Sequence, residues 1–302
     1  MTGETGDMMN TILITGANGQ LGTELRRYPW PEGWGVHAVD IDTLDLTDTA
    51  AIAALVASRP WAAVINGAAY TAVDKAESDL VTAWAVNALA PAAFAQACRE
   101  ADVPLVQVST DYVFDGSKPG GWDVDDAVGP LNVYGASKLG GEMAVRTGTP
   151  RYAIVRTSWV VSAHGHNFIK TMLRLGAERE RLTVVDDQHG APTGAADLAA
   201  ALATIAMRMA QDRDLAGTWH FTNAGETTWA GFARAIFASA QRYGGPSPEV
   251  AGITTTDYPV PATRPAHSRL SHDTLTRDFG IVPRDWQAAL DDIIDELYGE
   301  AA

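Results

Sequence analysis

A glycine-rich turn near the start of the chain constrains the fold more than any other feature. Residues 11–15 form a short, apolar, β-branched run, as a buried parallel strand does, and glycines follow it at once. Gly16, Gly19 and Gly22 then lead into a helical pattern. In a strand–turn–helix unit such glycines permit a tight turn, let the backbone approach a pyrophosphate and let the helix pack closely on the strand. The turn therefore predicts a dinucleotide site, with the phosphates at a helix N-terminus.

Short apolar segments and helical segments alternate through the rest of the first half. Strands are expected at 35–39, 62–66, 104–108 and 152–155, with helices between them that include 48–58 and 83–101. This alternation indicates a parallel sheet with helices on both faces. The second half is less regular, with helices expected at 167–180, 197–209, 228–243 and 285–298. The predicted fold class is α/β, a Rossmann-type doubly wound parallel sheet with a smaller C-terminal substrate-binding domain.

The same pattern suggests how the chain divides. Residues 1–10 are polar and acidic, and we expect them to form a disordered tail. Residues 11–160 are expected to form the dinucleotide-binding domain, joined by parts of 190–240. Residues 161–302 are expected to form a discontinuous substrate-binding region.

Charge and composition exclude several classes of function. The net charge of −15 argues against binding to nucleic acid or to anionic membranes. The apolar stretches are shorter than the ~18 residues of a membrane span, so no membrane segment is expected. A lone cysteine, Cys98, excludes a disulfide within the chain and fits a cytoplasmic protein.

A tyrosine and a lysine four residues apart, Tyr134 and Lys138, indicate redox chemistry on a carbonyl. On a helix this spacing places both side chains on one face, one turn apart. A nearby ammonium favours the phenolate, so we expect Lys138 to lower the pKa of Tyr134 and to let it exchange a proton near neutral pH.

Acidic residues after the second expected strand bear on the choice of cofactor. Asp40 lies about 20 residues beyond the glycine turn, where an acid accepts hydrogen bonds from the adenosine ribose. Asp40 and Asp42 would repel a 2′-phosphate, and no lysine or arginine occurs in the 31–58 window. Arg26 or Arg27 of the first helix could offset this repulsion. We therefore expect both NADH and NADPH to be used.

Several further segments resemble one family, the dTDP-4-dehydrorhamnose reductases, which are extended short-chain dehydrogenases/reductases. The matching segments are 15–22, 71–77, 109–114, 130–135 and 156–159, followed by 167–174, 187–193 and 264–270. They occur in the family's order and cover the chain from about 11 to 290. The blocks 109–114 and 130–138 are specific, whereas the glycine turn alone is not.

The resemblance implies a role for individual residues. Tyr134 and Lys138 match the catalytic pair, and Thr110 matches the assisting hydroxyl. Substrate contacts are expected from Thr110, Asp111, Trp159 and Arg264. The expected cofactor-binding residues are Gly16, Gly19, Gln20, Leu21, Gly22, Asp40, Asp45, Leu46, Ala68, Ala69, Tyr70, Thr71 and Val108, together with Tyr134 and Lys138.

The resemblance also implies a reaction, the NAD(P)H-dependent reduction of dTDP-4-dehydro-L-rhamnose to dTDP-L-rhamnose, the last step of dTDP-rhamnose biosynthesis. Hydride would reach the 4-keto carbon, and Tyr134 would donate the proton. One alternative is a sugar-nucleotide epimerase or dehydratase, but dehydratases carry Asp-Glu after the active-site Thr, and here Asp111 and Tyr112 follow Thr110. Another is a non-catalytic NADP-binding regulatory subunit, against which the intact Tyr134, Lys138 and Thr110 argue.

Some members of the family form homodimers through magnesium-bound glutamates. Glu24 matches one such position, but Ala196 occupies another and offers no carboxylate. We therefore expect no metal site of this kind, and a homodimer is left open.

Overall fold

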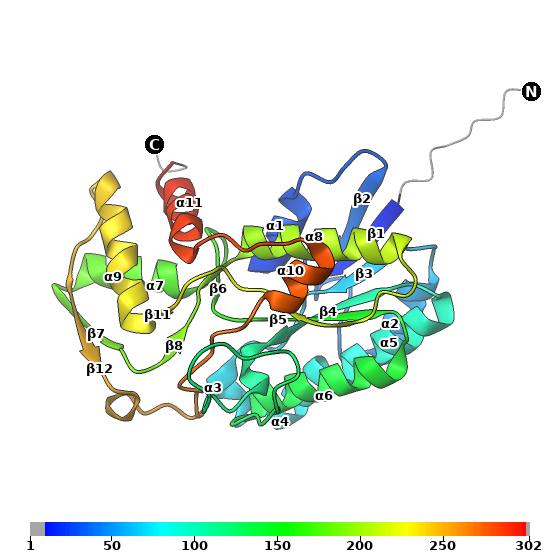
Figure 1. The fold of residues 1–302 in the computed structure, drawn as a ribbon, viewed down its shortest axis with the longest axis horizontal. Coiled ribbons are helices and arrows are strands. Elements are labelled where there is room, and N and C mark those ends of the chain that lie inside the picture. Colours follow the sequence, from blue (N-terminus) through cyan, green and yellow to red (C-terminus); the bar gives the residue numbers. More distant parts are fainter. Residues whose placement is uncertain (1–9, 300–302) are drawn as a thin grey trace, which may run out of the picture.

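The computed structural model describes residues 10–299, and the expected tail lies almost entirely outside them. Its main feature is a six-stranded sheet in which every pairing is parallel, in the order β10-β5-β4-β3-β1-β2 (Figure 1). The strands are β1 (Asn10–Thr15), β2 (Trp34–Val39), β3 (Ala63–Asn66), β4 (Leu105–Thr110), β5 (Tyr152–Thr157) and β10 (Gly217–His220). Since β2 and β3 lie on opposite sides of β1, the strand order reverses there, which is where ligands bind in such sheets.

Helices cover both faces of this sheet, as Figure 1 shows. One face carries α1 (Gln20–Arg27), α8 (Ala195–Gln211) and α10 (Asp273–Phe279), and the other carries α2 (Thr49–Ala57), α5 (Ala90–Ala101) and α6 (Val133–Gly148). Successive residues of β1 pack against the helices on opposite faces of the sheet. Ile12 and Ile14 pack with α1 and α8, while Leu13 packs with α2 and α5. The expected doubly wound α/β fold is therefore confirmed.

Polar side chains set where two of these helices begin. The Asp48 carboxylate accepts hydrogen bonds from the backbone of Ala50 and Ala51, both at 3.0 Å, and so caps α2. Asn132 caps α6 by accepting from the Gly135 N–H at 2.8 Å. Its amide also donates to the Thr263 carbonyl, so the start of α6 is held from both sides.

One helical stretch differs from the expectation that no segment would reach membrane length. Leu80–Ala101 runs through α4 (Leu80–Trp84), the π-helical turn η1 (Ala85–Leu89) and α5, and it is long and apolar enough to cross a membrane by length and composition alone. In the structure α5 packs against α2 and α6, with Phe94 and Cys98 fully buried. We interpret the stretch as a core helix of the sheet layer.

A second, smaller lobe has its own core. It contains α7 (Phe168–Glu178), α9 (Trp229–Ala240) and α11 (Trp286–Gly299), around the parallel pair β7 (Arg181–Val185) and β12 (Glu249–Ile253). Two short ladders, β8 (His189–Gly190) with β11 (Thr227–Thr228) and β6 (Val160–Val161) with β9 (Thr193–Gly194), lie between the lobes. The remaining elements are α3 (Val73–Ala76) and the 3₁₀ turns η2 (Asp111–Val113), η3 (Gln241–Tyr243) and η4 (Thr255–Asp257).

The chain passes between the lobes more than once. After entering the second lobe it returns to add α8 and β10 to the main sheet layer, and later α10, whose Leu275 is buried in the α8 core. The segment before α10 also lies against the first lobe, where Trp122 exchanges backbone hydrogen bonds with Arg269 and Ser271. On these contacts we propose a discontinuous division into a dinucleotide-binding and a substrate-binding part.

A buried ion pair joins the sheet to the helix that carries Tyr134. Arg156, the second-last residue of β5, donates to both carboxylate oxygens of Glu142 on α6 at 2.8 Å. Both side chains are almost fully buried, at 1% and 0% exposure. The Arg156 guanidinium also lies 5.0 Å from the centre of the Phe114 ring. Because a buried charge without its partner is costly, this pair fixes the position of α6 on the sheet.

We predict that Glu142→Gln lowers the free energy of unfolding by about 3–5 kcal/mol, because it leaves the Arg156 charge buried and only partly compensated. The matched control is Glu178→Gln, which breaks an exposed pair with Arg174 of 3.2 Å and should change stability by less than about 1 kcal/mol. Urea denaturation of the three proteins measures both values. Equal effects of the two substitutions would contradict a special role for the buried pair.

Candidate active site

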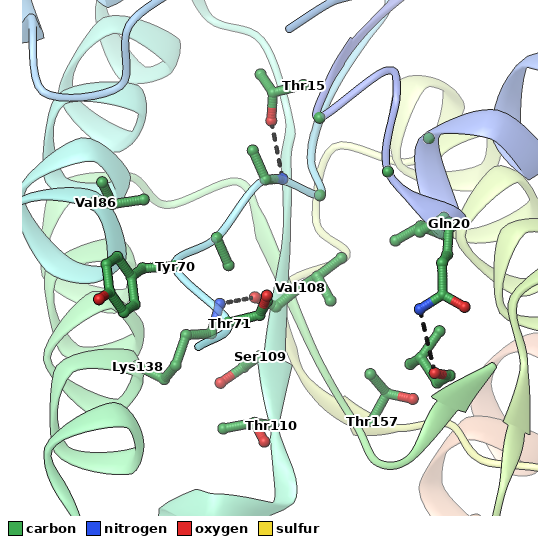
Figure 2. Close-up of a pocket in the computed structure, with 18 of the residues that line it drawn as sticks. Thr15, Gln20, Tyr70, Thr71, Val86, Val108, Ser109, Thr110, Lys138 and Thr157 are labelled. Carbon is green, nitrogen blue, oxygen red and sulfur yellow. Dashed lines mark hydrogen bonds between the residues drawn. The ribbon is translucent and has the colours of Figure 1, made fainter. Parts of the chain in front are cut away.

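A cavity of about 800 Å³ opens at the carboxyl ends of the parallel strands. Its lining comes from the turns that follow β1, β2, β3, β4 and β5, from α6, and from Trp229 at the start of α9 in the second lobe. Figure 2 shows a close-up of a pocket where Tyr70 and Lys138 lie on one side and Gln20 and Thr157 on the other. The cavity therefore lies at the point where the strand order reverses.

The glycine turn has the backbone shape that its sequence predicts. Gly16 adopts a φ of +77°, and a Cβ atom there would lie 3.1 Å from the backbone of Ala68 in the turn after β3. A Cβ on Gly22 would lie 2.0 Å from the Gly16 carbonyl oxygen, so only glycine lets α1 approach the turn. Gly19 directly precedes α1, and the first residues of that helix, Gln20, Leu21 and Gly22, line the cavity. This cradle fits the phosphates of a dinucleotide.

The two acidic residues after β2 have different surroundings. Asp40 lines the cavity, and its carboxylate accepts from the Asn18 and Ile41 amides, both at 2.7 Å. Asp42 is exposed and lies outside the cavity lining, although Ile41 beside it belongs to that lining, and its position near a 2′-phosphate stays a prediction. Arg27 is turned toward α11, where it pairs with Glu296 at 2.6 Å, and the suggestion that Arg26 or Arg27 meets a bound 2′-phosphate stays a prediction.

Other expected cofactor residues line the same cavity. They are Leu21, Asp45, Leu46, Ala68, Ala69, Tyr70, Thr71 and Val108. Gln20 also lines it, but its side chain is directed to the segment after β5: it donates to the Val160 carbonyl at 3.3 Å and accepts from Ser162 and Asn167. Gln20 therefore ties the glycine turn to the second half of the chain.

Asn87 holds the cavity residue Tyr70 in place, and sequence reasoning missed it. Its amide oxygen accepts from the Tyr70 N–H at 2.9 Å, and its NH₂ group donates to the Tyr70 carbonyl at 3.1 Å and to Ser137 on α6 at 3.0 Å. It lies on the π-helical turn η1, a feature that often marks functional sites. A single asparagine in an otherwise alanine-rich helix was the available signal.

The Tyr134–Lys138 pair lies on α6 with both side chains at the cavity (Figure 2 labels Lys138). Burial raises the pKa of Tyr134 to about 12, although a hydrogen bond with the Thr110 hydroxyl acts to lower it. Burial lowers the pKa of Lys138 to about 8, although Glu142 one turn away acts in the opposite direction. The Lys138 ammonium donates to the Val108 carbonyl at 2.7 Å. The expected lowering of the tyrosine pKa is therefore wrong here, because burial and the nearby Asp111 carboxylate raise the pKa of Tyr134 more than the Thr110 hydroxyl lowers it.

Thr110 and Asp111 lie side by side at the end of β4. The Thr110 hydroxyl donates to the Asp111 carboxylate at 2.8 Å and accepts from the Tyr112 amide at 3.2 Å. Burial raises the pKa of Asp111 to about 6, against hydrogen bonds from Ser268 and Thr110. One Asp111 oxygen and the hydroxyls of Ser109 and Thr157 are buried and have no hydrogen-bond partner among residues 10–299. All three residues line the cavity, so polar groups are available there for a ligand.

Trp159 and Arg264, the other expected substrate contacts, differ in their position. Trp159 lines the cavity and stacks on Trp229, a residue that sequence reasoning missed because no strand end or motif marks it. Arg264 is not part of the lining, and its guanidinium donates to both oxygens of Asp74 at 3.0 and 2.8 Å. These hydrogen bonds hold the pKa of Asp74 below its usual value. Arg264 thus joins the segment before α10 to α3.

Three side chains could together hold a metal ion: Glu24, His164 and Glu296, whose ligand atoms all lie within 4.8 Å of one another. Arg27 lies among them, 3.4 Å from Glu24 and 2.6 Å from Glu296. Its positive charge already compensates the two carboxylates. Ala196, at the start of α8, adds no ligand, so the structure gives magnesium no support.

The glycine turn, the Tyr–Lys pair on α6 and the two-lobed α/β fold define the class as an extended short-chain dehydrogenase/reductase. The family described as RmlD substrate binding domain matches residues 9–298, so the chain belongs to this family. A dTDP-4-dehydrorhamnose reductase from Sinorhizobium fredii is 42% identical over 283 residues, 91% of this chain and 94% of that protein. The resemblance inferred from the sequence is thereby confirmed.

Solved structures give the same result. A dTDP-4-dehydrorhamnose reductase from Clostridium acetobutylicum superimposes with a TM-score of 0.89 at 38% identity, covering 95% of this chain and 99% of that one. A dTDP-4-dehydrorhamnose reductase from Bacillus anthracis, solved in complex with NADP, also has a TM-score of 0.89, at 37% identity, with 96% and 100% covered.

We predict that the buried Asp111 carboxylate destabilises the protein at neutral pH. Its pKa lies above the ordinary value of 3.8, so the folded state keeps the proton longer and stability is lost as pH rises from about 4 through about 6. The total loss in the free energy of unfolding between these pH values is about 3 kcal/mol. Asp111→Asn should therefore be more stable than the native protein at pH 7 and equal to it at pH 4 in denaturant titrations. A gain that is the same at both pH values would contradict this explanation.

Proposed function

We propose that this protein reduces dTDP-4-dehydro-L-rhamnose to dTDP-L-rhamnose with NADPH or NADH, and that Tyr134, Lys138 and Thr110 carry the chemistry. The observation that supports this most is the arrangement of these side chains. They line the same cavity as the glycine turn, at the carboxyl ends of the parallel strands. The curated relatives at about 40% identity over nearly the whole chain are dTDP-4-dehydrorhamnose reductases, which supports the substrate.

In this proposal a bound dihydronicotinamide supplies the hydride that reaches the 4-keto carbon of the sugar. Tyr134 donates its phenolic proton to the carbonyl oxygen. The high pKa of Tyr134, about 12, keeps this proton in place at neutral pH, as an acid in the reductive direction requires. Lys138, with a pKa of about 8, carries a positive charge below that pH and stabilises the negative charge that develops as the proton leaves.

Thr110 would assist at the same oxygen. Its hydroxyl is held by the Asp111 carboxylate and by the Tyr112 amide, which fixes its position next to Tyr134. One buried oxygen of Asp111, a cavity residue, has no hydrogen-bond partner among the described residues, so it can accept a hydrogen bond from a hydroxyl of the sugar. Trp159 offers an aromatic face to the apolar C–H surface of the sugar ring.

The glycine turn and the residues after β3 would hold the dinucleotide. Gly16, Gly19 and Gly22 leave room for the pyrophosphate, and Asp40 lies where it can accept from the adenosine ribose. The reductase from Bacillus anthracis was solved with NADP, whereas Asp40 favours NADH by charge. We therefore propose that the protein uses both cofactors.

The sequence alternatives are weaker. A dehydratase needs a second carboxylate beside Asp111, and Tyr112 occupies that position with its ring edge against Tyr134, 5.6 Å between centres. A regulatory subunit would not require the catalytic side chains to converge. We further propose a cytoplasmic location, in keeping with the buried thiol of Cys98, and no part for nucleic acid or membranes. A homodimer without bridging magnesium is compatible with the Arg27 ion pairs.

We predict that Tyr134→Phe lowers kcat by about 10²–10⁴-fold, because it removes the proton donor and keeps the ring. Binding of NADPH should change little, which titration of cofactor fluorescence measures. The assay is NADPH oxidation with dTDP-4-dehydro-L-rhamnose. Near-native turnover in this variant would exclude Tyr134 as the proton donor.

We predict that Asp40→Asn raises the ratio of kcat/KM for NADPH to that for NADH. The substitution removes the charge that repels a 2′-phosphate but keeps an oxygen that can accept from the Asn18 amide. Asp42→Asn is the control, since Asp42 lies outside the cavity lining. An unchanged ratio for Asp40→Asn would mean that Asp40 only stabilises the turn.

A further inference from the structure

Trp229, the first residue of α9, lines the cavity although neither the sequence motifs nor the strand ends point to it. We propose that Trp229 is a positioning residue that holds the Trp159 indole as a rigid wall for the sugar of the nucleotide substrate. This inference rests on the proposed function, because it assigns a role to a residue in the substrate half of the same site.

The two indoles form a close face-to-face stack between segments far apart in the sequence. Their ring centres are 3.6 Å apart and their planes differ by 14°. Trp159 directly follows β5 of the main sheet, whereas Trp229 belongs to the second lobe. The stack therefore joins the two lobes at the cavity.

The backbone of Trp159 shows that its side chain is held in place. Its φ is +49°, in the left-handed region, which is sterically unfavourable for a bulky residue. Within residues 10–299 the only other non-glycine residue with positive φ is Asp102, which ends helix α5. Such a conformation persists when its surroundings fix it, and it is typical of functional sites.

The second lobe supplies these fixed surroundings. A Cβ atom on Gly190 would lie 2.8 Å from the Trp159 ring, so glycine is needed where β8 passes the indole. Gly190 pairs with Thr227 of β11, two residues before Trp229. The β8–β11 ladder therefore places Gly190 and Trp229 around the same ring, and removing either contact would leave Trp159 less constrained.

Trp229 is itself firmly anchored. Phe168 packs on it with 4.7 Å between ring centres, and Phe168 in turn stacks on the buried Phe232. The preceding Thr228 caps α9 by accepting from the Gly231 amide at 3.0 Å, and its hydroxyl donates to Asp186. The wall formed by Trp159 is thus connected to the core of the second lobe.

A fixed indole suits the apolar C–H face of a sugar ring, and its rigidity lowers the entropy lost on binding. Loss of Trp229 should therefore weaken binding of the sugar nucleotide and leave the cofactor half unaffected. The stack also has its own signature, since two indoles in face-to-face contact give an exciton couplet in far-ultraviolet circular dichroism.

The test compares Trp229→Ala, Trp229→Phe and the control Trp34→Phe, an indole on β2 at the far edge of the main sheet. Both Trp229 variants should lose the couplet, and the control should keep it. Trp229→Ala should raise KM for dTDP-4-dehydro-L-rhamnose about 10-fold or more and change KM for NADPH less than about 2-fold. Trp229→Phe keeps an aromatic ring against Trp159, so its KM for dTDP-4-dehydro-L-rhamnose should lie between those of Trp229→Ala and the Trp34→Phe control.

Calorimetric binding of dTDP-L-rhamnose gives the same comparison without turnover. An affinity and a KM that stay native after the couplet is lost would overturn the role of Trp229, even if the reductase reaction is confirmed. Equal losses for sugar nucleotide and NADPH would overturn it too. A native protein that binds dTDP-L-rhamnose through the stack but oxidises no cofactor would instead contradict the proposed function.

Discussion

The buried ion pair between Arg156 and Glu142 is the contact on which the arrangement of the site depends. It joins β5 to α6, and residues expected to act in the site lie close to both partners. Trp159 follows Arg156 by three residues, and Lys138 lies one helical turn before Glu142 on α6. Two charges buried together cannot separate without a large loss of stability, so α6 has one position on the sheet. The Tyr134 hydroxyl is thereby brought to the end of β4, beside Thr110.

A second constraint comes from the place where the strand order reverses. The turns after β1 and β3 touch there, with Gly16 against Ala68, and the space beside them remains open as the cavity. Buried polar atoms of three lining residues, Ser109, Asp111 and Thr157, lack hydrogen-bond partners in the part of the chain that the structure describes. A structure that leaves such groups unpaired sacrifices stability, which is expected where the groups serve a ligand. At these strand ends, unpaired polar groups lower the stability of the fold but remain available to bind a ligand.

Much of this could be predicted from the sequence because the signals are local. Strand, glycine turn and helix follow one another directly, and the apolar runs of β1, β3, β4 and β5 are each close to the expected ranges. The family resemblance then indicated Thr110, Asp111 and Trp159, all of which line the cavity. Family membership is confirmed, whereas the role of each site residue and the domain boundaries remain predictions.

The features that were missed depend on contacts between distant segments. Glu142 and Trp229 have no motif of their own, and their partners lie 14 and 70 residues away in the sequence. The pKa of Tyr134 was misjudged because spacing shows the nearby lysine but not the degree of burial, which dominates. Arg264 was expected to contact the substrate, yet its guanidinium donates to Asp74, 190 residues earlier in the sequence. The apolar length of the helical stretch at 80–101 was underestimated, because the stretch extends across three helical segments.

Transfer of the hydride from the cofactor to the sugar can be measured directly with a deuterium label. NADPH deuterated at the reactive C4 position is incubated with the protein and dTDP-4-dehydro-L-rhamnose, and the product is analysed by NMR. We predict dTDP-L-rhamnose with one deuterium at C4 of the sugar and one equivalent of cofactor oxidised. A product without deuterium at that carbon, or no product with either NADPH or NADH, would contradict it.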